Sequence, residues 1–233
     1  GTALLPLMSR QLRSGDEEAA MASQNRAIEF SLFLTLPAAV ALVVIAEPII
    51  SVLFERGAFD AVSVKATAGA LAIYATGLPA YVLVKALAPG YFAREDTATP
   101  VKIAVFALTV NLILNLILMG PFKHLGIAMA TSVSAWCNAL ILAYILKSRG
   151  HLVFDARILS RTPRMIAASL VMGGAVYYGA ASLAELLEES VISNIIAIAV
   201  LVGGGLLVYG ALSLVFGAAS RDDLSRLFGR KST

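Results

Sequence analysis

Charged side chains are scarce in this chain. They make up 14% of its 233 residues, whereas apolar residues make up 59% and the mean hydropathy is +0.84. Soluble domains carry about 25% charged residues, so this composition excludes an ordinary soluble domain and indicates a membrane protein. The apolar runs are long and uniform instead of alternating, which predicts spanning helices and argues against the strands of an outer-membrane barrel.

Cysteine and histidine are almost absent. The chain has one cysteine, Cys137, and two histidines, His124 and His151, which lie far apart and have no acidic or cysteine neighbours. A disulfide within the chain and a CxxC metal site are therefore excluded. No nucleophile triad or Gly-rich phosphate loop can be assembled, and a net charge of +3 is a weak sign of nucleic-acid binding. We predict a protein that is no enzyme, holds no metal and binds no nucleic acid.

Six runs are long enough to span a bilayer as helices, which takes about 20 apolar residues each. They cover residues 30–54, 66–92, 103–119, 126–146, 165–186 and 192–217. The opening "GTALLPLMSR" is typical of the end of an earlier span followed by a basic exit, and the chain begins without a methionine or a signal-peptide pattern. The predicted fold is an all-α polytopic membrane bundle of six complete spans plus the end of a preceding one.

The predicted organisation has five segments. Residues 1–29 hold the end of the preceding helix and a cytoplasmic loop, and 30–146 hold four spans. A basic loop at 147–164 leads to two further spans at 165–217 and a basic tail at 218–233. Fourteen of the 18 lysines and arginines fall on the side that carries both chain ends, and three fall on the other side. The positive-inside rule therefore predicts that both ends of this chain are cytoplasmic.

Lys85 is the one cation inside a predicted span. A lysine in hydrocarbon costs roughly 2.5–3.5 kcal/mol on insertion scales, so such residues usually face a cavity or a partner. The alternative is that its long stem carries the ammonium group to the headgroup region. We favour a cavity, where an uncompensated positive charge would suit an anionic substrate such as a phosphate.

Two further features lie within the spans. Pro79 and the pair Pro89-Gly90 predict a helix break in the second span, as in transporters, although prolines are also common in membrane helices. Asn111 and Asn115 share a helix face and are followed by Thr131 in the next span. This polar seam is expected to join two helices by hydrogen bonds, with a weakly held monovalent cation as the alternative. Glycines in the last two spans indicate either close helix contact or a shallow groove.

The stretch "VKALAPGYFAREDTATPVKIA", residues 84–104, resembles a signature of the MurJ/MviN family, the bacterial lipid II flippases of the MOP exporter superfamily. The segments "GTALLPLMSRQ" and "GPFKHLGIAMATSVSAWCNA" are similar to two other blocks of that family. The order and spacing agree, and the resemblance runs across essentially the whole chain.

This resemblance implies the C-terminal part of a fourteen-helix transporter of the inner membrane. Its expected substrate is lipid II, an undecaprenyl-diphosphate-linked disaccharide pentapeptide that alternating access moves from the cytoplasmic to the periplasmic face. It matches Lys85 to a cavity cation for the diphosphate and the last two helices to a groove for the lipid tail. Expected partners are lipid II, membrane lipids and the N-terminal helices of the same protein.

No cofactor is expected, and either a monovalent cation or the membrane potential could drive transport. Two alternatives stay open at this point. The first is a drug or polysaccharide-lipid exporter of the same superfamily, and the second is a non-transporting scaffold for cell-wall enzymes.

Overall fold

The computed structural model describes residues 4–183 and 191–218, and every element within these ranges is a helix. The helices are α1 (Leu4–Arg13), α2 (Glu17–Val44), α3 (Ala46–Phe54), α4 (Ala61–Phe92), α5 (Ala98–Phe122), α6 (His124–Ser148), α7 (Ala156–Ser182) and α8 (Val191–Val215). Six of them, all but the short α1 and α3, contain stretches long and apolar enough to cross a membrane. The predicted helical bundle with six spans is confirmed. The basic tail at 219–233 and the acidic residues at 184–190 lie outside the described residues.

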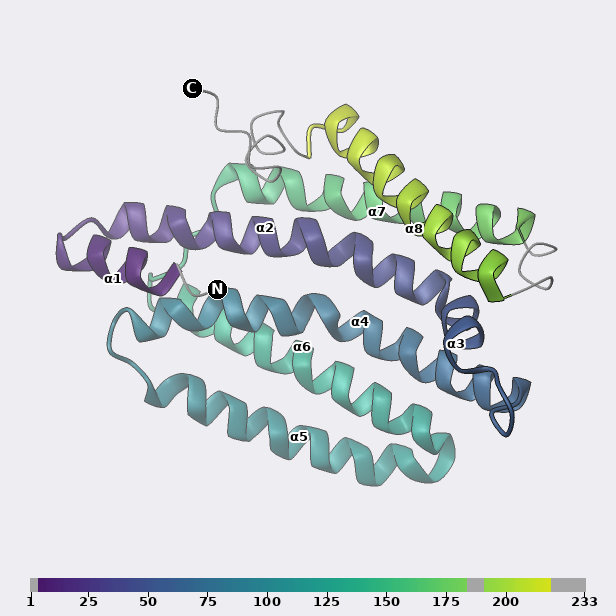
Figure 1. Cartoon of the computed structure of the whole chain (residues 1–233). Helices are drawn as coiled ribbons and strands as arrows, with labels where there is room; N and C mark the ends of the chain where they lie inside the picture. The colour runs from purple at the N-terminus through teal and green to yellow at the C-terminus, as the bar shows by residue number, and fades with distance from the viewer. Residues whose placement is uncertain (1–3, 184–190, 219–233) are drawn as a thin grey trace.

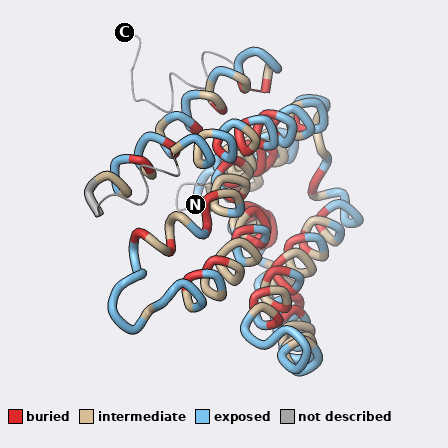
Figure 2. The backbone as a smooth tube through the Cα atoms, turned by 90° about the vertical axis from the view of Figure 1, so that its right-hand side faces the viewer, coloured by how far each residue is buried: buried red, intermediate tan, exposed pale blue. Residues whose placement is uncertain are grey.

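The long helices lie side by side in the order α5, α6, α4, α2, α7 and α8 (Figure 1). Short connections join them, so consecutive long helices run in opposite directions. Buried residues gather where neighbouring helices meet, and exposed residues cover the outer faces (Figure 2). We call the end of the bundle that holds residues 14–16, 93–97 and 149–155 the basic end.

An aspartate caps the first turn of four of these helices. Asp16, Asp60, Asp96 and Asp155 each accept a hydrogen bond of 2.9 Å from a backbone N–H three residues further on. Such caps satisfy donors that the first turn of a helix leaves unpaired, and the negative charge suits the positive end of the helix dipole. Hydrogen bonds from Thr99 and Arg149 lower the pKa of Asp96 to about 2. The carboxylate of Asp96 caps α5 through its bond from the backbone N–H of Thr99.

The helix boundaries differ from the predicted spans in three main places, the first being α2, which begins at Glu17 and not at residue 30. The first predicted span, 30–54, is divided at Ile45 into α2 and α3, because Pro48 cannot donate to the helical ladder and crowds the preceding turn. The predicted basic loop at 147–164 is non-helical only at 149–155, and α7 already begins at Ala156.

The predicted helix break at Pro79, Pro89 and Gly90 is wrong. Helix α4 runs without interruption through all three residues to Phe92. Neighbouring side chains donate to carbonyls close to both prolines, since Trp136 of α6 donates to Thr76 O at 3.0 Å and Gln24 of α2 donates to Leu87 O at 3.2 Å. These bonds tie α4 to α6 and α2 beside the prolines, but the carbonyls that Pro79 and Pro89 leave without a helical donor are those of Ala75 and Lys85, four residues earlier.

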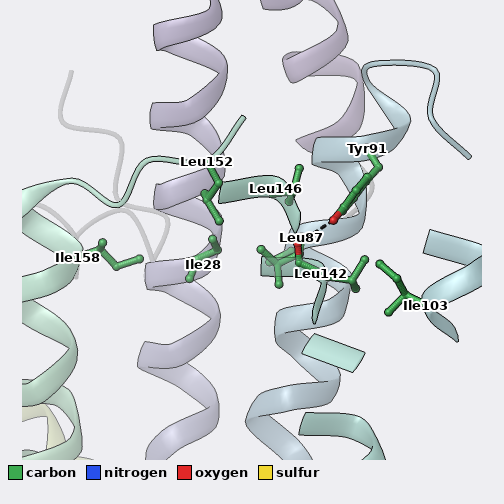
Figure 3. Packing of buried hydrophobic residues seen from close by; sticks show 9 residues of the cluster. Ile28, Leu87, Tyr91, Ile103, Leu142, Leu146, Leu152 and Ile158 are labelled. Atoms are coloured by element: carbon green, nitrogen blue, oxygen red, sulfur yellow. Dashed lines mark hydrogen bonds between the residues drawn. The ribbon is translucent and has the colours of Figure 1, made fainter. Parts of the chain in front are cut away.

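Gly90 has a packing role and does not end the helix. A Cβ atom added there would lie 2.4 Å from Nε2 of Gln24, whose side chain is fully buried between α2 and α4. The neighbouring Tyr91 is also buried and donates to the carbonyl of Leu142 in α6 at 2.7 Å. Figure 3 shows this bond within a cluster of buried apolar residues that ties α2, α4, α6 and α7 together near the basic end.

Candidate functional site

Lys85 lies on a face of α4 that no described helix covers. Tyr74, Tyr81 and Phe92 are 40%, 43% and 39% exposed, and Lys85 is exposed as well. Steps of seven, four and seven residues place these four side chains on one side of the helix. We call this row the Lys85 face. The other side of α4 packs against α2 and α6.

No carboxylate compensates Lys85 within residues 4–183 and 191–218, where no ion pair or hydrogen bond to its ammonium group is found. Lys85 precedes the end of α4 by seven residues, about 10 Å along the axis at 1.5 Å per residue. Tyr81 and Tyr74 lie deeper still. A lysine and two tyrosines at this depth indicate a polar environment.

The exposed face of α5 provides the contrast. Its most exposed side chains are aliphatic, among them Leu108 at 67%, Leu112 at 58% and Leu116 at 68%. Exposed aliphatic side chains of this kind are suited to contact with lipid acyl chains. The Lys85 face differs from it in chemistry although both are exposed, which favours the cavity interpretation over the one in which the lysine reaches to the headgroups.

Tyr74 and Tyr81 were missed by the sequence reasoning. Their signal was available, because both lie at heptad-like steps from Lys85 inside an apolar run. The sequence prediction considered Lys85 by itself and not the residues that share its helix face.

The polar seam does come together between α5 and α6. Asn115 Nδ2 donates to Asn111 Oδ1 at 2.9 Å, and Asn111 Nδ2 donates to Ser134 at 3.1 Å and to Thr131 at 3.4 Å. The Oδ1 atom of Asn115 is buried and has no hydrogen-bond partner among the described residues. These bonds join the two helices, as the packing interpretation expects. No group of three His, Cys, Asp or Glu residues in the described part of the chain could hold a metal ion.

An ion-pair cluster at the basic end was also missed. Glu29 of α2 is buried and accepts hydrogen bonds from Arg161 at 2.6 Å, from Arg157 at 3.2 Å and from Arg26. Arg26 also pairs with Asp155. The cluster ties α7 to α2. Sequence reasoning placed Arg157 and Arg161 in a loop, although their spacing of four residues is that of one helix face.

The fold and the Lys85 face define a multi-pass helical membrane protein with a cation at bilayer depth, an arrangement typical of transporters. The family model described as "Lipid II flippase MurJ" matches residues 1–204. The chain therefore belongs to the MurJ family, a family of transporters and not of catalysts, and is a multi-pass protein of the bacterial inner membrane.

Individual relatives agree with the family match. A "Probable lipid II flippase MurJ" of Rhizobium meliloti (strain 1021) is 42% identical over 227 residues, which are 97% of this chain and 42% of that protein. The protein of the same description from Rhizobium tropici is 47% identical over 178 residues, 76% of this chain and 33% of its own length.

A solved structure, "Lipid II flippase MurJ, inward closed conformation", superposes with a TM-score of 0.72 at 25% identity. The superposed region covers 98% of this chain and 44% of the chain in the solved structure. The chain thus spans less than half the length of each of these proteins.

Proposed function

We propose that this chain forms the C-terminal part of a fourteen-helix lipid II flippase. The protein would carry the undecaprenyl-diphosphate-linked disaccharide pentapeptide from the cytoplasmic to the periplasmic face by alternating access. In this proposal residues 30–146 supply four spans of the second lobe and 165–217 supply two additional spans. The observation that carries it is the uncompensated charge of Lys85 on a face with tyrosines at bilayer depth.

Lys85 would contribute to binding the diphosphate. An ammonium group suits a phosphate oxygen because the hydrogen bond is charge-assisted. Tyr81, one turn away, offers a hydroxyl donor and an aromatic ring to the part of the headgroup beyond the phosphates. The N-terminal helices of the same protein would close the other side of this cavity.

The pair α7–α8 would contact the lipid tail. Three glycines there allow close packing, since a Cβ atom at Gly173, Gly179 or Gly205 would meet a side chain at 2.5–3.1 Å. At Gly174, Gly203, Gly204 and Gly210 the added Cβ atom would meet nothing within 4 Å. The second set leaves shallow hollows on the helix surfaces, which supports a groove for an isoprenoid chain.

The polar seam is assigned to helix packing in this proposal, with no cofactor. A monovalent cation at Asn111, Asn115 and Thr131 would have to compete for two oxygen atoms that already accept hydrogen bonds. Asn111 Oδ1 accepts from Asn115 within α5, and Thr131 Oγ1 accepts from Asn111 across the two helices, whereas Asn115 Oδ1 has no partner among the described residues. The membrane potential is the other source of energy that fits a charged substrate.

The first experiment uses the full-length protein in its host. Depletion should remove lipid II from the outer face of the inner membrane, where a membrane-impermeant reagent modifies exposed headgroups. A plasmid copy with Lys85→Ala should restore export poorly, because the loss of a hydrogen bond to a charged group costs about 1.5–3 kcal/mol, or roughly 10–100-fold in affinity. Lys85→Arg should retain most of the activity.

The matched control is Lys102→Ala, which removes an exposed lysine near the start of α5. It should export normally. Unchanged outer-face lipid II on depletion would overturn the flippase function and leave an exporter of another substrate or a scaffold. Normal export by Lys85→Ala would overturn only the role of the charge.

A further inference from the structure

The connection between α6 and α7, residues 149–155, packs against other helices at the basic end. Leu152 is fully buried in one apolar cluster with Ile28 of α2 and residues of α4 (Figure 3). Asn25 of α2 is also buried, and its side chain donates to Val153 O at 2.7 Å. These contacts attach to the rest of the bundle the segment that leads into α7.

His151 lies directly before Leu152 and has a hydrogen-bonded backbone. Gly150 adopts a positive φ of 75°, and its N–H group donates to Lys147 O at 3.0 Å. The N–H group of His151 donates to Leu146 O at 2.9 Å. This is the Schellman arrangement that commonly ends a helix. It holds the half-buried imidazole of His151 beside the point where Leu152 packs.

Two arginines lie beside the end of α4 at the same junction. Arg149 pairs with Asp96 at 2.6 Å, and its guanidinium carbon lies 6.0 Å from the centre of the Tyr91 ring. Arg94 donates through Nη1 to Gly90 O at 2.9 Å. Its Nη2 atom is buried and has no hydrogen-bond partner in the part of the chain that the structure describes. Both guanidinium groups are therefore held in place near the connection.

Charges of both signs face His151 from three elements. The cations are Arg94 after α4 and Arg149 in the connection itself, and the carboxylates are Glu17 at the start of α2 and Asp96 before α5. Burial is the largest influence and lowers the pKa of His151 from its ordinary value of 6.5. Arg94 and Arg149 lower this pKa further, against the opposite effect of Glu17 and Asp96. The neutral imidazole is therefore the form that suits the packed connection.

We propose that His151 makes the attachment of this connection sensitive to pH, so that protonation of its imidazole releases the connection from α2 and α4. Release exposes the imidazole to water and moves it away from Arg94, so the released form binds a proton more tightly. The attachment is then complete above about pH 6.5 and weakens as the pH falls further. Helix α7 stays attached, because its ion pairs with Glu29 lie beyond the connection and involve no histidine. This switch is independent of the proposed transport of lipid II.

Hydrogen–deuterium exchange of the full-length protein, read by mass spectrometry on peptides from residues 149–155, tests the proposal. Wild type and His151→Asn are compared at the same pH, each against its own unfolded peptide, so that the effect of pH on the exchange chemistry cancels. At about pH 7.5 the two connections should exchange alike, and at about pH 5.5 the wild-type connection should exchange several-fold faster. Peptides from α7 should show no such difference.

Two further variants separate His151 from other titrating groups. His124→Asn removes the other histidine of this chain, at the opposite end of the bundle, and should keep the wild-type acid response. Glu17→Gln removes a carboxylate that favours the charged imidazole and should enlarge the response. Because Glu17 is exposed, this variant does not depend on repacking the core.

Equal exchange by wild type and His151→Asn at both pH values would overturn the proposal. An acid response that fails to grow in Glu17→Gln would overturn it as well, because the charges that face His151 would then not govern its protonation.

Discussion

At the scale of single residues, Gly90 is a position where an added side chain has no room. Gln24 Nε2 and Oε1 would lie 2.4 Å and 2.9 Å from an added Cβ atom, and the side chain of Gln24 is fully buried. The amide cannot swing into solvent, so either its bond to Leu87 O breaks or the two helices move apart. In the block "LAPGYFAR", residues 87–94, Gly90 and Tyr91 therefore serve the packing of α4 at the basic end.

We expect Gly90→Ala to lower the free energy of unfolding by about 1–3 kcal/mol, the usual cost of overpacking. Thermal unfolding in a fixed detergent measures the change. Gly174→Ala is the matched control, because nothing lies within 4 Å of an added Cβ atom there and alanine is the better helix former. Equal stability of Gly90→Ala and the wild type would show that α2 and α4 do not approach this closely.

At the scale of helices, the α2–α7 contact depends on one buried carboxylate. Glu29 receives hydrogen bonds from three arginines, two of them on α7. Without Glu29 the three arginines would lose the carboxylate that they share. The apolar cluster of Ile45, Met172 and Tyr209 holds the same helices further along, so the ion pairs fix α7 at its basic end.

Glu29→Gln should therefore lower stability by about 2–3 kcal/mol. This is less than the roughly 3–5 kcal/mol for breaking a fully buried pair, because the side chains of Arg26 and Arg157 are 35% and 41% exposed. Thermal unfolding at low and at high salt would measure it, with the difference shrinking as salt rises. Glu47→Gln, at an exposed position in the first turn of α3, should change stability by no more than about 1 kcal/mol. Equal losses in both variants would contradict the role of Glu29.

At the scale of the whole molecule, hydropathy and length predicted the number of spans, because a bilayer imposes both on any helix that crosses it. The same reasoning missed the first thirteen residues of α2 and the start of α7. There Gln24, Asn25 and Glu29 are polar yet buried, since Gln24 and Glu29 find partners on other helices and Asn25 donates to Val153 O in the 149–155 connection. Sequence alone does not show such partners.

The orientation of the molecule is a prediction that follows from the distribution of charge. Replacing Cys137, the one cysteine, with alanine gives a background for single reporters. A cysteine at exposed Ser148, at the basic end, should react with a membrane-impermeant maleimide only after the inner membrane is permeabilised. A cysteine at exposed Ala58, in the connection between α3 and α4 at the opposite end, should react in intact spheroplasts. The reverse pattern would place the arginine cluster around Glu29 on the periplasmic side, against the positive-inside rule.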